Sequence, residues 1–421
     1  MLRRLVFALP ELSQNLMFAS VNGWFLYYLV TVLGLSPALA GAVFLIGRVL
    51  DAVLDVPVGF LSDRMARRGG RVRLIGVSLP LAACAFVVMW LAPAMGTSHT
   101  VVFLAATAGF SLFALFYTLV AVPRIALLPG YARTRPERIR QVAIDMVVAW
   151  FAVGMASAAF PALVGQAARH TEAPLTWGLA AAVVAVIGLA FYLPFLLRVD
   201  DRMLHPQGAE APLTLRQGLA RLRRLRQRLP FGRFFLLVLA PFLLQSVLPF
   251  YVSLHIGLPA EQQFPVLGAV FATALLAFPV WSRIAQRVSA RSQTLAALGI
   301  TACALVVMPF LPAGLSAPIF ALAVICGAGL SGLALAAWVL IPQTVDRAQQ
   351  MAEVPGEGLT SAAFTFINKL AAGGAAMING IALSLVPPRA GGGDSLIGWA
   401  ASLPAMACCL IAAALLLRGA R

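Results

Sequence analysis

The stretch GAVFLIGRVLDAVLDVPVGFLSDRMARRGGRVR, residues 41–73, decides the class of this protein. Residues 41–61 are apolar apart from three charged side chains, and about 20 helical residues are enough to cross the hydrocarbon core of a bilayer. Residues 62–73 then carry a cluster of arginines. An apolar helix followed by arginines is typical of a membrane span that ends at the cytoplasmic face. The stretch therefore predicts a transmembrane helix with charges at membrane depth.

Composition extends this prediction to the whole chain. Hydrophobic residues make up 61% and charged residues 11%, with a mean hydropathy of +0.92. These values leave too little polar surface for a soluble domain of this size. We therefore expect an all-α membrane protein with 12 transmembrane helices. The approximate spans are 15–34, 38–61, 74–94, 101–128, 141–166, 176–197, 233–255, 263–286, 293–312, 317–342, 358–386 and 394–418.

The net charge of +16 follows the topology of the expected spans. Arginines collect in every second connection, and the intervening loops are nearly free of them. This positive-inside pattern predicts that both termini are cytoplasmic, and it argues against a nucleic-acid partner, because the charges do not share one surface. The abundance of alanine and arginine fits a bacterial inner membrane. We expect a monomer whose partners are the lipid bilayer, a small solute and a cation.

Three of the charges inside apolar stretches form a candidate site, and each is costly at membrane depth. Asp51 and Asp55 are four residues apart and therefore share one helical face. Lys369, the one lysine of the chain, lies in TSAAFTFINKLAAGGAAMINGIALSL, residues 360–385. Two carboxylates on adjacent turns offer hard oxygen ligands to a small cation or share a proton. We expect an ion-coupled transporter whose charge site joins two distant helices; the alternative is a buried salt bridge that only fixes their packing.

The chain divides near its middle. We expect a six-helix bundle over 1–197, a cytoplasmic linker over 198–232 and a second six-helix bundle over 233–421. Leucines in the linker recur at spacings of three and four, which predicts an amphipathic helix. Such a helix either lies along the inner leaflet or is a solvated connection, and the sequence leaves both alternatives open.

A short motif follows the helix over 38–61. Its residues resemble the loop signature of the major facilitator superfamily: Gly59, Asp63, Arg64, Arg67 and Arg68. The resemblance implies a major facilitator fold of two six-helix bundles that rock to give alternating access. It also implies that this motif acts as a conformational gate.

A narrower resemblance rests on three segments. RVLDAVLDVPVGFLSDR (48–64), FYTLVAVPRIALLP (116–129), and TVD (344–346) with EG (357–358) and NKLAAGG (368–374) are similar to the glycoside-pentoside-hexuronide:cation symporters, the family of melibiose permease. The resemblance implies that Asp51 and Asp55 bind the cation, that Thr118 is an oxygen ligand and that Lys369 completes the charge network. The coupling ion would be Na⁺ or H⁺, with no other metal and no cofactor.

The chain departs from this family at several positions. Leu54 stands where the family has a polar asparagine, which favours protons over sodium. Ala121, Ile125 and Met146 replace charged and aromatic residues of sugar recognition, so the site is more apolar. The candidate substrate residues are Asn15, Tyr117, Arg124, Asp145, Trp150 and Thr365. Arg124 and Asp145 either pair with each other or meet a substrate, such as an anionic head group.

These observations favour a cation symporter of a sugar-like or other small organic solute. One alternative is a transporter of an amphiphile such as a lysolipid or drug. Another is a non-transporting membrane partner protein, which the charge triad disfavours. The chain carries no nucleotide-binding loop, no nucleophile elbow and no metal-binding cysteine or histidine spacing, so we expect no enzyme.

Overall fold

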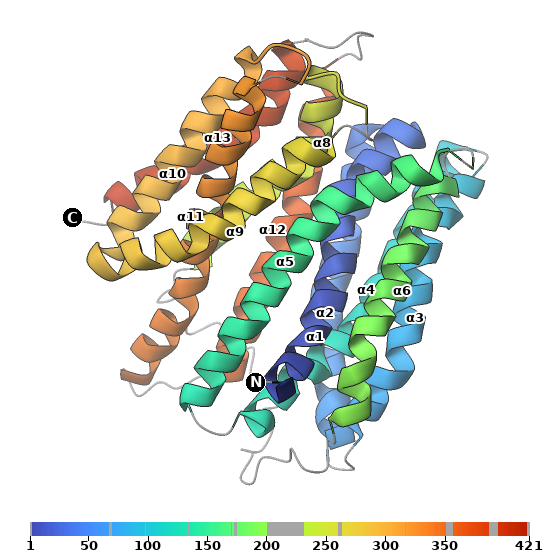
Figure 1. Ribbon diagram of the computed structural model, residues 1–421, viewed down its shortest axis with the longest axis vertical. Coiled ribbons are helices and arrows are strands. Elements are labelled where there is room, and N and C mark those ends of the chain that lie inside the picture. Colours follow the sequence, from blue (N-terminus) through green and yellow to red (C-terminus); the bar gives the residue numbers. More distant parts are fainter. Residues whose placement is uncertain are drawn as a thin grey trace. The chain divides into compact units, whose positions relative to one another are not determined.

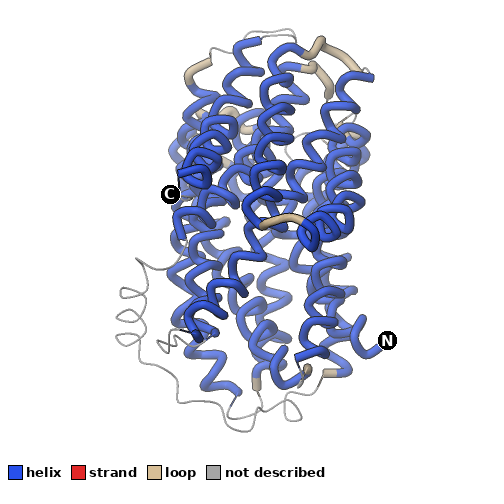
Figure 2. The backbone as a smooth tube through the Cα atoms, turned by 90° about the vertical axis from the view of Figure 1, so that its left-hand side faces the viewer, coloured by secondary structure: helices blue, strands red, loops and turns tan. Residues whose placement is uncertain are grey.

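The computed structural model describes residues 2–66, 70–96, 98–132, 135–169, 171, 175–199, 231–259, 263–315, 317–350, 357–386 and 395–418. Within these ranges the chain is helical with short turns and contains no strand (Figure 2). It forms two compact units: Met1–Ala209 with Pro259–Gly268, and Glu210–Leu258 with Ala269–Arg421. The predicted linker over 198–232 lies almost wholly outside the described residues, so its amphipathic helix stays a prediction.

The first unit contains six α-helices in its described part. They are α1 (Leu2–Ser20), α2 (Pro37–Ala66), α3 (Arg71–Leu91), α4 (His99–Tyr131), α5 (Arg135–Ala167) and α6 (Leu175–Arg198). Shorter helical turns extend them: η1 (Val21–Phe25), η2 (Tyr28–Val32) and η3 (Ala92–Met95). Helix α1 packs against α5 and α6, α3 against α4 and α6, and α2 against α4 (Figure 1).

The described part of the second unit also contains six α-helices. They are α8 (Phe231–Phe250), α9 (Phe264–Arg287), α10 (Ala290–Val307), α11 (Ala317–Gln350), α12 (Glu357–Ser384) and α13 (Ser395–Arg418), with the turns η5 (Tyr251–His255) and η7 (Met308–Phe310). Helix α8 packs against α12 and α13, and α10 packs against α11 and α13. The first residues of α9 belong to the segment grouped with the first unit.

Ten helices of the described chain are long and apolar enough to cross a membrane, and they correspond to α3–α6 and α8–α13. This confirms an all-α membrane protein. Helices α1 and α2 are not among the ten. Both carry several charged side chains, including Glu11 in α1 and Asp51 in α2. The predicted number of twelve spans therefore stays a prediction.

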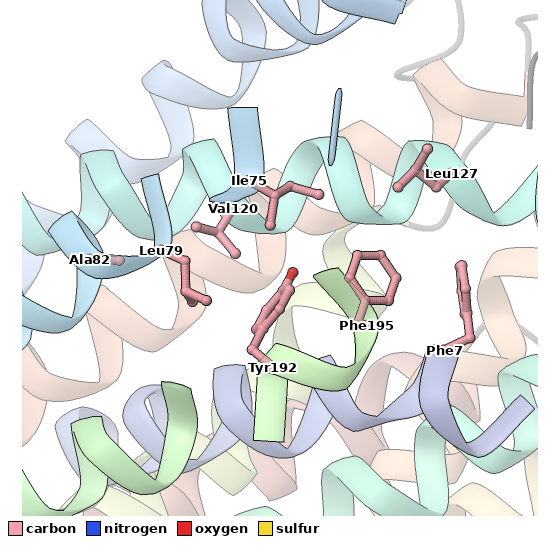
Figure 3. Packing of buried hydrophobic residues seen from close by; sticks show 8 residues of the cluster. All are labelled: Phe7, Ile75, Leu79, Ala82, Val120, Leu127, Tyr192 and Phe195. Atoms are coloured by element: carbon pink, nitrogen blue, oxygen red, sulfur yellow. The ribbon is translucent and has the colours of Figure 1, made fainter. Parts of the chain in front are cut away.

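A buried cluster fastens four helices of the first unit to one another, as Figure 3 shows. Its side chains come from α1, α3, α4 and α6: Phe7, Ile75, Leu79, Ala82, Val120, Leu127, Tyr192 and Phe195. Phe7 also stacks on Tyr131 with ring centroids 4.0 Å apart. The guanidinium carbon of Arg124 lies 5.6 Å from the same ring centroid. The apolar core thus borders directly on a charged group of the first unit.

Both units end their first helix in the same way. Tyr28 opens the π-turn η2 and donates its hydroxyl to the carbonyl of Trp90 at 2.6 Å. Tyr251 opens η5 and donates to the carbonyl of Met308 at 2.8 Å. A glycine with positive φ follows each tyrosine by six residues: Gly34 at 68° and Gly257 at 80°. Glycine adopts this conformation without the strain that other residues incur. The shared arrangement supports an internal repeat of the two units.

Candidate functional site

Asp51 in α2 is the centre of a buried hydrogen-bond network. Its side chain is 1% exposed. The hydroxyl of Thr118 in α4 donates to Oδ1 at 2.7 Å, and Nη1 of Arg48 donates to Oδ2 at 3.4 Å. Arg48 lies one turn before Asp51 on the same helix, which brings the two side chains together. Both oxygens of the carboxylate therefore accept hydrogen bonds within the first unit.

Arg48 connects this carboxylate to α1. Its Nη2 donates to Oδ1 of Asn22 at 2.6 Å, and Asn22 lies in the π-turn η1. The guanidinium carbon lies 4.6 Å from the ring centroid of Phe18 and 5.3 Å from that of Phe110. A Cβ on Gly47 would collide with Phe110, so this glycine lets the ring lie against α2. The network joins α1, α2 and α4. Single π-helical turns within α-helices, like η1, occur often at functional sites.

Asp55 and Lys369 complete the predicted charge site, but they belong to different units. Asp55 lies one turn beyond Asp51 in α2 and is half-buried. Lys369 in α12 is 8% exposed, and Thr365, one turn before it, is exposed. Both charged side chains take part in interactions. The predicted meeting of Lys369 with the two aspartates stays a prediction.

A second network centres on Arg124 in α4, whose side chain is 3% exposed. Its Nη1 donates to Oε1 of Glu11 in α1, and its Nη2 donates to Oδ2 of Asp145 in α5 at 3.2 Å. Nη2 also donates to the carbonyl of Phe7 at 3.3 Å. Of the two alternatives for Arg124 and Asp145, the structure thus shows the ion pair between them. We call Glu11, Arg124 and Asp145 the buried triad.

Every carboxylate oxygen of the buried triad accepts a hydrogen bond. Oε2 of Glu11 accepts one from Nδ2 of Asn15 at 2.8 Å. Oδ1 of Asp145 accepts one from Nε2 of Gln141 at 2.8 Å. The remaining two oxygens face Arg124. One guanidinium thus faces two carboxylates, so the triad has a formal charge of −1 when all three groups are ionised.

The other predicted substrate residues lie nearby or at the surface of the first unit. Tyr117 is half-buried; its ring centroid lies 6.0 Å from that of Phe18, and it interacts electrostatically with Glu11 and with Asp51. Trp150 on α5 is half-buried. The apolar replacements Ile125 and Met146 are exposed, which makes this part of the surface apolar. Substrate roles for these residues stay predictions.

The predicted gate is only partly described. Gly59 is half-buried in α2 and Arg64 is exposed, whereas Arg67, Arg68 and the side chain of Asp63 lie outside the described residues.

A neighbouring arginine, absent from the predicted gate, is buried at the start of α3. The Nε of Arg71 donates to Oγ of Ser62 at 3.2 Å, and its Nη1 donates to the carbonyl of Ala126 at 3.3 Å. It therefore ties the end of α2 to α4. In the sequence it looks like one more arginine of the cytoplasmic cluster.

Three further contact residues are absent from the set that the sequence predicts: Glu11, Asn22 and Gln141. A pattern on α1 indicates two of them. Glu11, Asn15, Phe18 and Asn22 follow one another at spacings of four, three and four, and such positions share one helical face. Polar side chains at this spacing in an otherwise apolar segment indicate a face that contacts charged partners.

Comparison with known proteins indicates the family of this chain. Residues 6–420 match the profile of a family described as MFS/sugar transport protein. The uncharacterized symporter YnaJ of Bacillus subtilis is 25% identical over 353 residues, which cover 82% of this chain and 74% of the relative. Sodium-dependent lysophosphatidylcholine symporter 1 of Mus musculus is 24% identical over 359 residues, covering 77% of this chain and 66% of the relative.

Among solved structures, that of the nucleoside transporter NupG superimposes with a TM-score of 0.68. The sequences are 11% identical, and the superposition covers 99% of each chain. At this low identity the likeness concerns the fold alone.

Proposed function

This chain belongs to the family of MFS/sugar transport proteins, and we propose that it is a cation-coupled symporter of a sugar-like or other small organic solute. Membership in the family and the relative named as a symporter support this function. In this proposal the protein is a transporter and not an enzyme. It works as a monomer in the bacterial inner membrane with both termini in the cytoplasm.

The environment of Asp51 carries the proposal. A carboxylate that is 1% exposed in a membrane protein is costly, and such groups commonly mark ion pathways. A carboxylate together with the hydroxyl of Thr118, 2.7 Å away, offers oxygen ligands to a small cation. The guanidinium of Arg48 stabilises the carboxylate between cation-binding events. We assign the cation to Asp51, Asp55 and Thr118, with Lys369 of the second unit completing the charge network.

The coupling ion in this proposal is H⁺ in preference to Na⁺. Leu54 lies between the two aspartates and provides no oxygen ligand. A proton needs only a carboxylate, whereas a metal cation needs several oxygens. Cation and solute then each stabilise the transferable arrangement more strongly together than apart, which is the thermodynamic condition for coupling. The motif from Gly59 to Arg68 would act as the gate between access states.

An amphiphile is the second candidate solute. The mouse relative carries lysophosphatidylcholine in its name, and this chain presents exposed apolar side chains at Ile125 and Met146. A thermal-shift screen of the purified protein against sugars, lysolipids and drugs, with and without sodium, separates the two classes. A ligand that binds only the folded state raises the apparent melting temperature.

The decisive experiment is uptake of the solute found in that screen by proteoliposomes under an imposed pH or sodium gradient. Asp51→Asn should abolish the gradient-driven part of uptake while the protein stays folded. Glu137→Gln is the control, because it removes an exposed acid of the same unit outside both charged networks and should keep gradient dependence. Full gradient-driven uptake by the Asp51→Asn protein would refute the assignment. Stimulation by sodium at fixed pH would refute the preference for protons.

A further inference from the structure

We propose that the solute of this symporter is neutral or cationic, and that the buried triad of Glu11, Arg124 and Asp145 makes the protein reject anionic solutes such as hexuronides. The inference rests on the proposed function and narrows its substrate class. It follows from where the donors of two buried arginines point and from the balance of charge around them.

Arg48 and Arg124 are two of the three buried arginines in the described part of the first unit, and each uses both terminal nitrogens as donors. Arg124 donates to Glu11, to Asp145 and to the carbonyl of Phe7. Arg48 donates to Asp51 and Asn22. The Nε atoms of both arginines are buried and have no hydrogen-bond partner among the described residues. Because each guanidinium is almost fully buried, an anion could bind it only by displacing one of the groups that cover it.

The side chains of Arg48 and Arg124 are each 3% exposed, so neither offers an anion an open cationic partner. Desolvating an anion without such a partner costs several kcal/mol in a protein interior, so an anionic solute is disfavoured.

The charge balance acts in the same direction. The triad contains two acids and one base, which leaves it with a formal charge of −1, whereas Arg48 and Asp51 balance each other. An anionic solute would be repelled by the extra negative charge, and an ammonium group would be attracted. A neutral solute would meet neither effect.

Glu11 provides the accessible acceptor of this network. Its side chain is 20% exposed, whereas those of Arg124 and Asp145 are 3% and 10% exposed. A carboxylate oxygen has lone pairs for more than one hydrogen bond, so Glu11 can accept from a solute while it keeps Arg124 and Asn15. Hydroxyl and ammonium groups donate hydrogen bonds, and a solute carboxylate does not. The exposed edge of the triad therefore matches a polyol or an amine.

The test uses solutes that differ only in charge. Binding to the purified full-length protein is measured by titration calorimetry at pH 7 for a methyl hexoside, the corresponding hexuronide and the corresponding amino sugar. A second series consists of lysophosphatidylcholine, an anionic lysolipid and a long-chain alkylamine. In the series that binds, the neutral or cationic member should bind at least tenfold more tightly than the anionic member. Equal or tighter binding of the anion overturns the inference, and so does failure of all six compounds to bind.

Variants connect the preference to the triad. Glu11→Gln and Asp145→Asn each remove one negative charge, and each should improve anion binding relative to neutral binding by at least about tenfold. A unit charge about 10 Å away has that effect at an effective dielectric constant of about 20, and a closer charge has a larger one. Glu137→Gln makes the same change in charge at an exposed position at the start of α5. It should leave the ratio of anion affinity to neutral-solute affinity unchanged. If both triad variants keep the wild-type ratio, the triad is only a structural brace and the inference fails.

These outcomes are separate from failure of the proposed function. Binding is measured without any ion gradient, so the charge preference is observed whether or not the protein transports. If the preference holds but no cation gradient drives uptake of the preferred solute, the symport proposal fails. If gradient-driven uptake occurs and the anion is carried equally well, the charge inference alone fails.

Discussion

Replacing Arg124 with methionine should destabilise the first unit more than any other single substitution in its charged networks. Methionine keeps an unbranched side chain of similar length but removes the positive charge. Glu11 and Asp145 would then lie near each other with no cation between them. Their side chains are only 20% and 10% exposed, so solvent would screen the two charges poorly. Arg124→Met thus tests whether the triad braces α1, α4 and α5.

The magnitude follows from the geometry. Nη2 of Arg124 lies 3.2 Å from Oδ2 of Asp145, where two unit charges attract by about 5 kcal/mol at an effective dielectric constant of about 20. Desolvation offsets part of this attraction in the intact protein, but removal of one partner leaves the other charges buried and typically costs about 3–5 kcal/mol. At about 2–4 °C for each kcal/mol, the melting temperature should fall by roughly 6–20 °C.

The assay is thermal unfolding of the purified protein in one detergent, arranged as a double-mutant cycle. Arg124→Met is combined with the pair Glu11→Gln and Asp145→Asn, which removes both uncompensated charges. The combined variant should be more stable than Arg124→Met alone by at least about 1 kcal/mol, because coupled sites are not additive. A wild-type melting temperature for Arg124→Met, or a combined variant that is less stable than Arg124→Met, would refute the reasoning.

Three further substitutions test other parts of the structure. Thr118→Val should weaken cation-dependent uptake at least tenfold, because the hydroxyl of Thr118 donates to the carboxylate of Asp51. Thr107→Val in the same helix should leave uptake unchanged, because the hydroxyl of Thr107 bonds to the backbone of its own helix. Equal effects of the two substitutions would contradict the proposed site. Gly47→Ala should lower the melting temperature by the equivalent of about 1–3 kcal/mol, because the added methyl collides with the ring of Phe110 in α4. An unchanged melting temperature would contradict this packing. Tyr28→Phe should cost about 1 kcal/mol in thermal unfolding, because a buried carbonyl loses its donor, and no loss would show that the hydroxyl is dispensable.

Most of the fold follows from hydropathy, and the differences occur where helices continue beyond their apolar part. The predicted span over 317–342 becomes α11, which continues to Gln350. The predicted start at residue 141 lies inside α5, which already begins at Arg135. Helical hydrogen bonds do not require apolar side chains, so polar ends outside the bilayer leave no hydropathy signal.

The same effect hides one residue of the buried triad. The first span was expected from residue 15, but α1 begins at Leu2 and contains Glu11. A hydropathy profile assigns a half-buried glutamate such as Glu11 to a loop, because the sequence around the glutamate does not reveal its partner on another helix. The partner, Arg124, lies 113 positions away along the chain. Long-range ion pairs of this kind cannot be predicted from local patterns.

The contacts of the proposed cation residues follow from the sequence more directly than those of the proposed solute residues. Asp51 and Thr118 come from motifs that resemble a known family, and the structure brings their side chains within 2.7 Å of each other. Asn15, Arg124 and Asp145 were predicted as substrate residues, and the structure places all three in one network, held together by Glu11. Whether an arginine contacts a solute or an acid depends on the tertiary arrangement, which residue spacing alone does not determine.

One face of α1 contacts both charged networks, and this gives a physical route for coupling within the first unit. Glu11 and Asn15 hydrogen-bond to each other beside Arg124, and Asn22, about two turns further, accepts from Arg48 next to Asp51. A helix transmits displacement along its length, because its turns are joined by backbone hydrogen bonds. Glu11 and Asn22 are therefore connected through one continuous run of helix, and the π-helix Val21–Phe25 contains the residue that holds Arg48 beside Asp51.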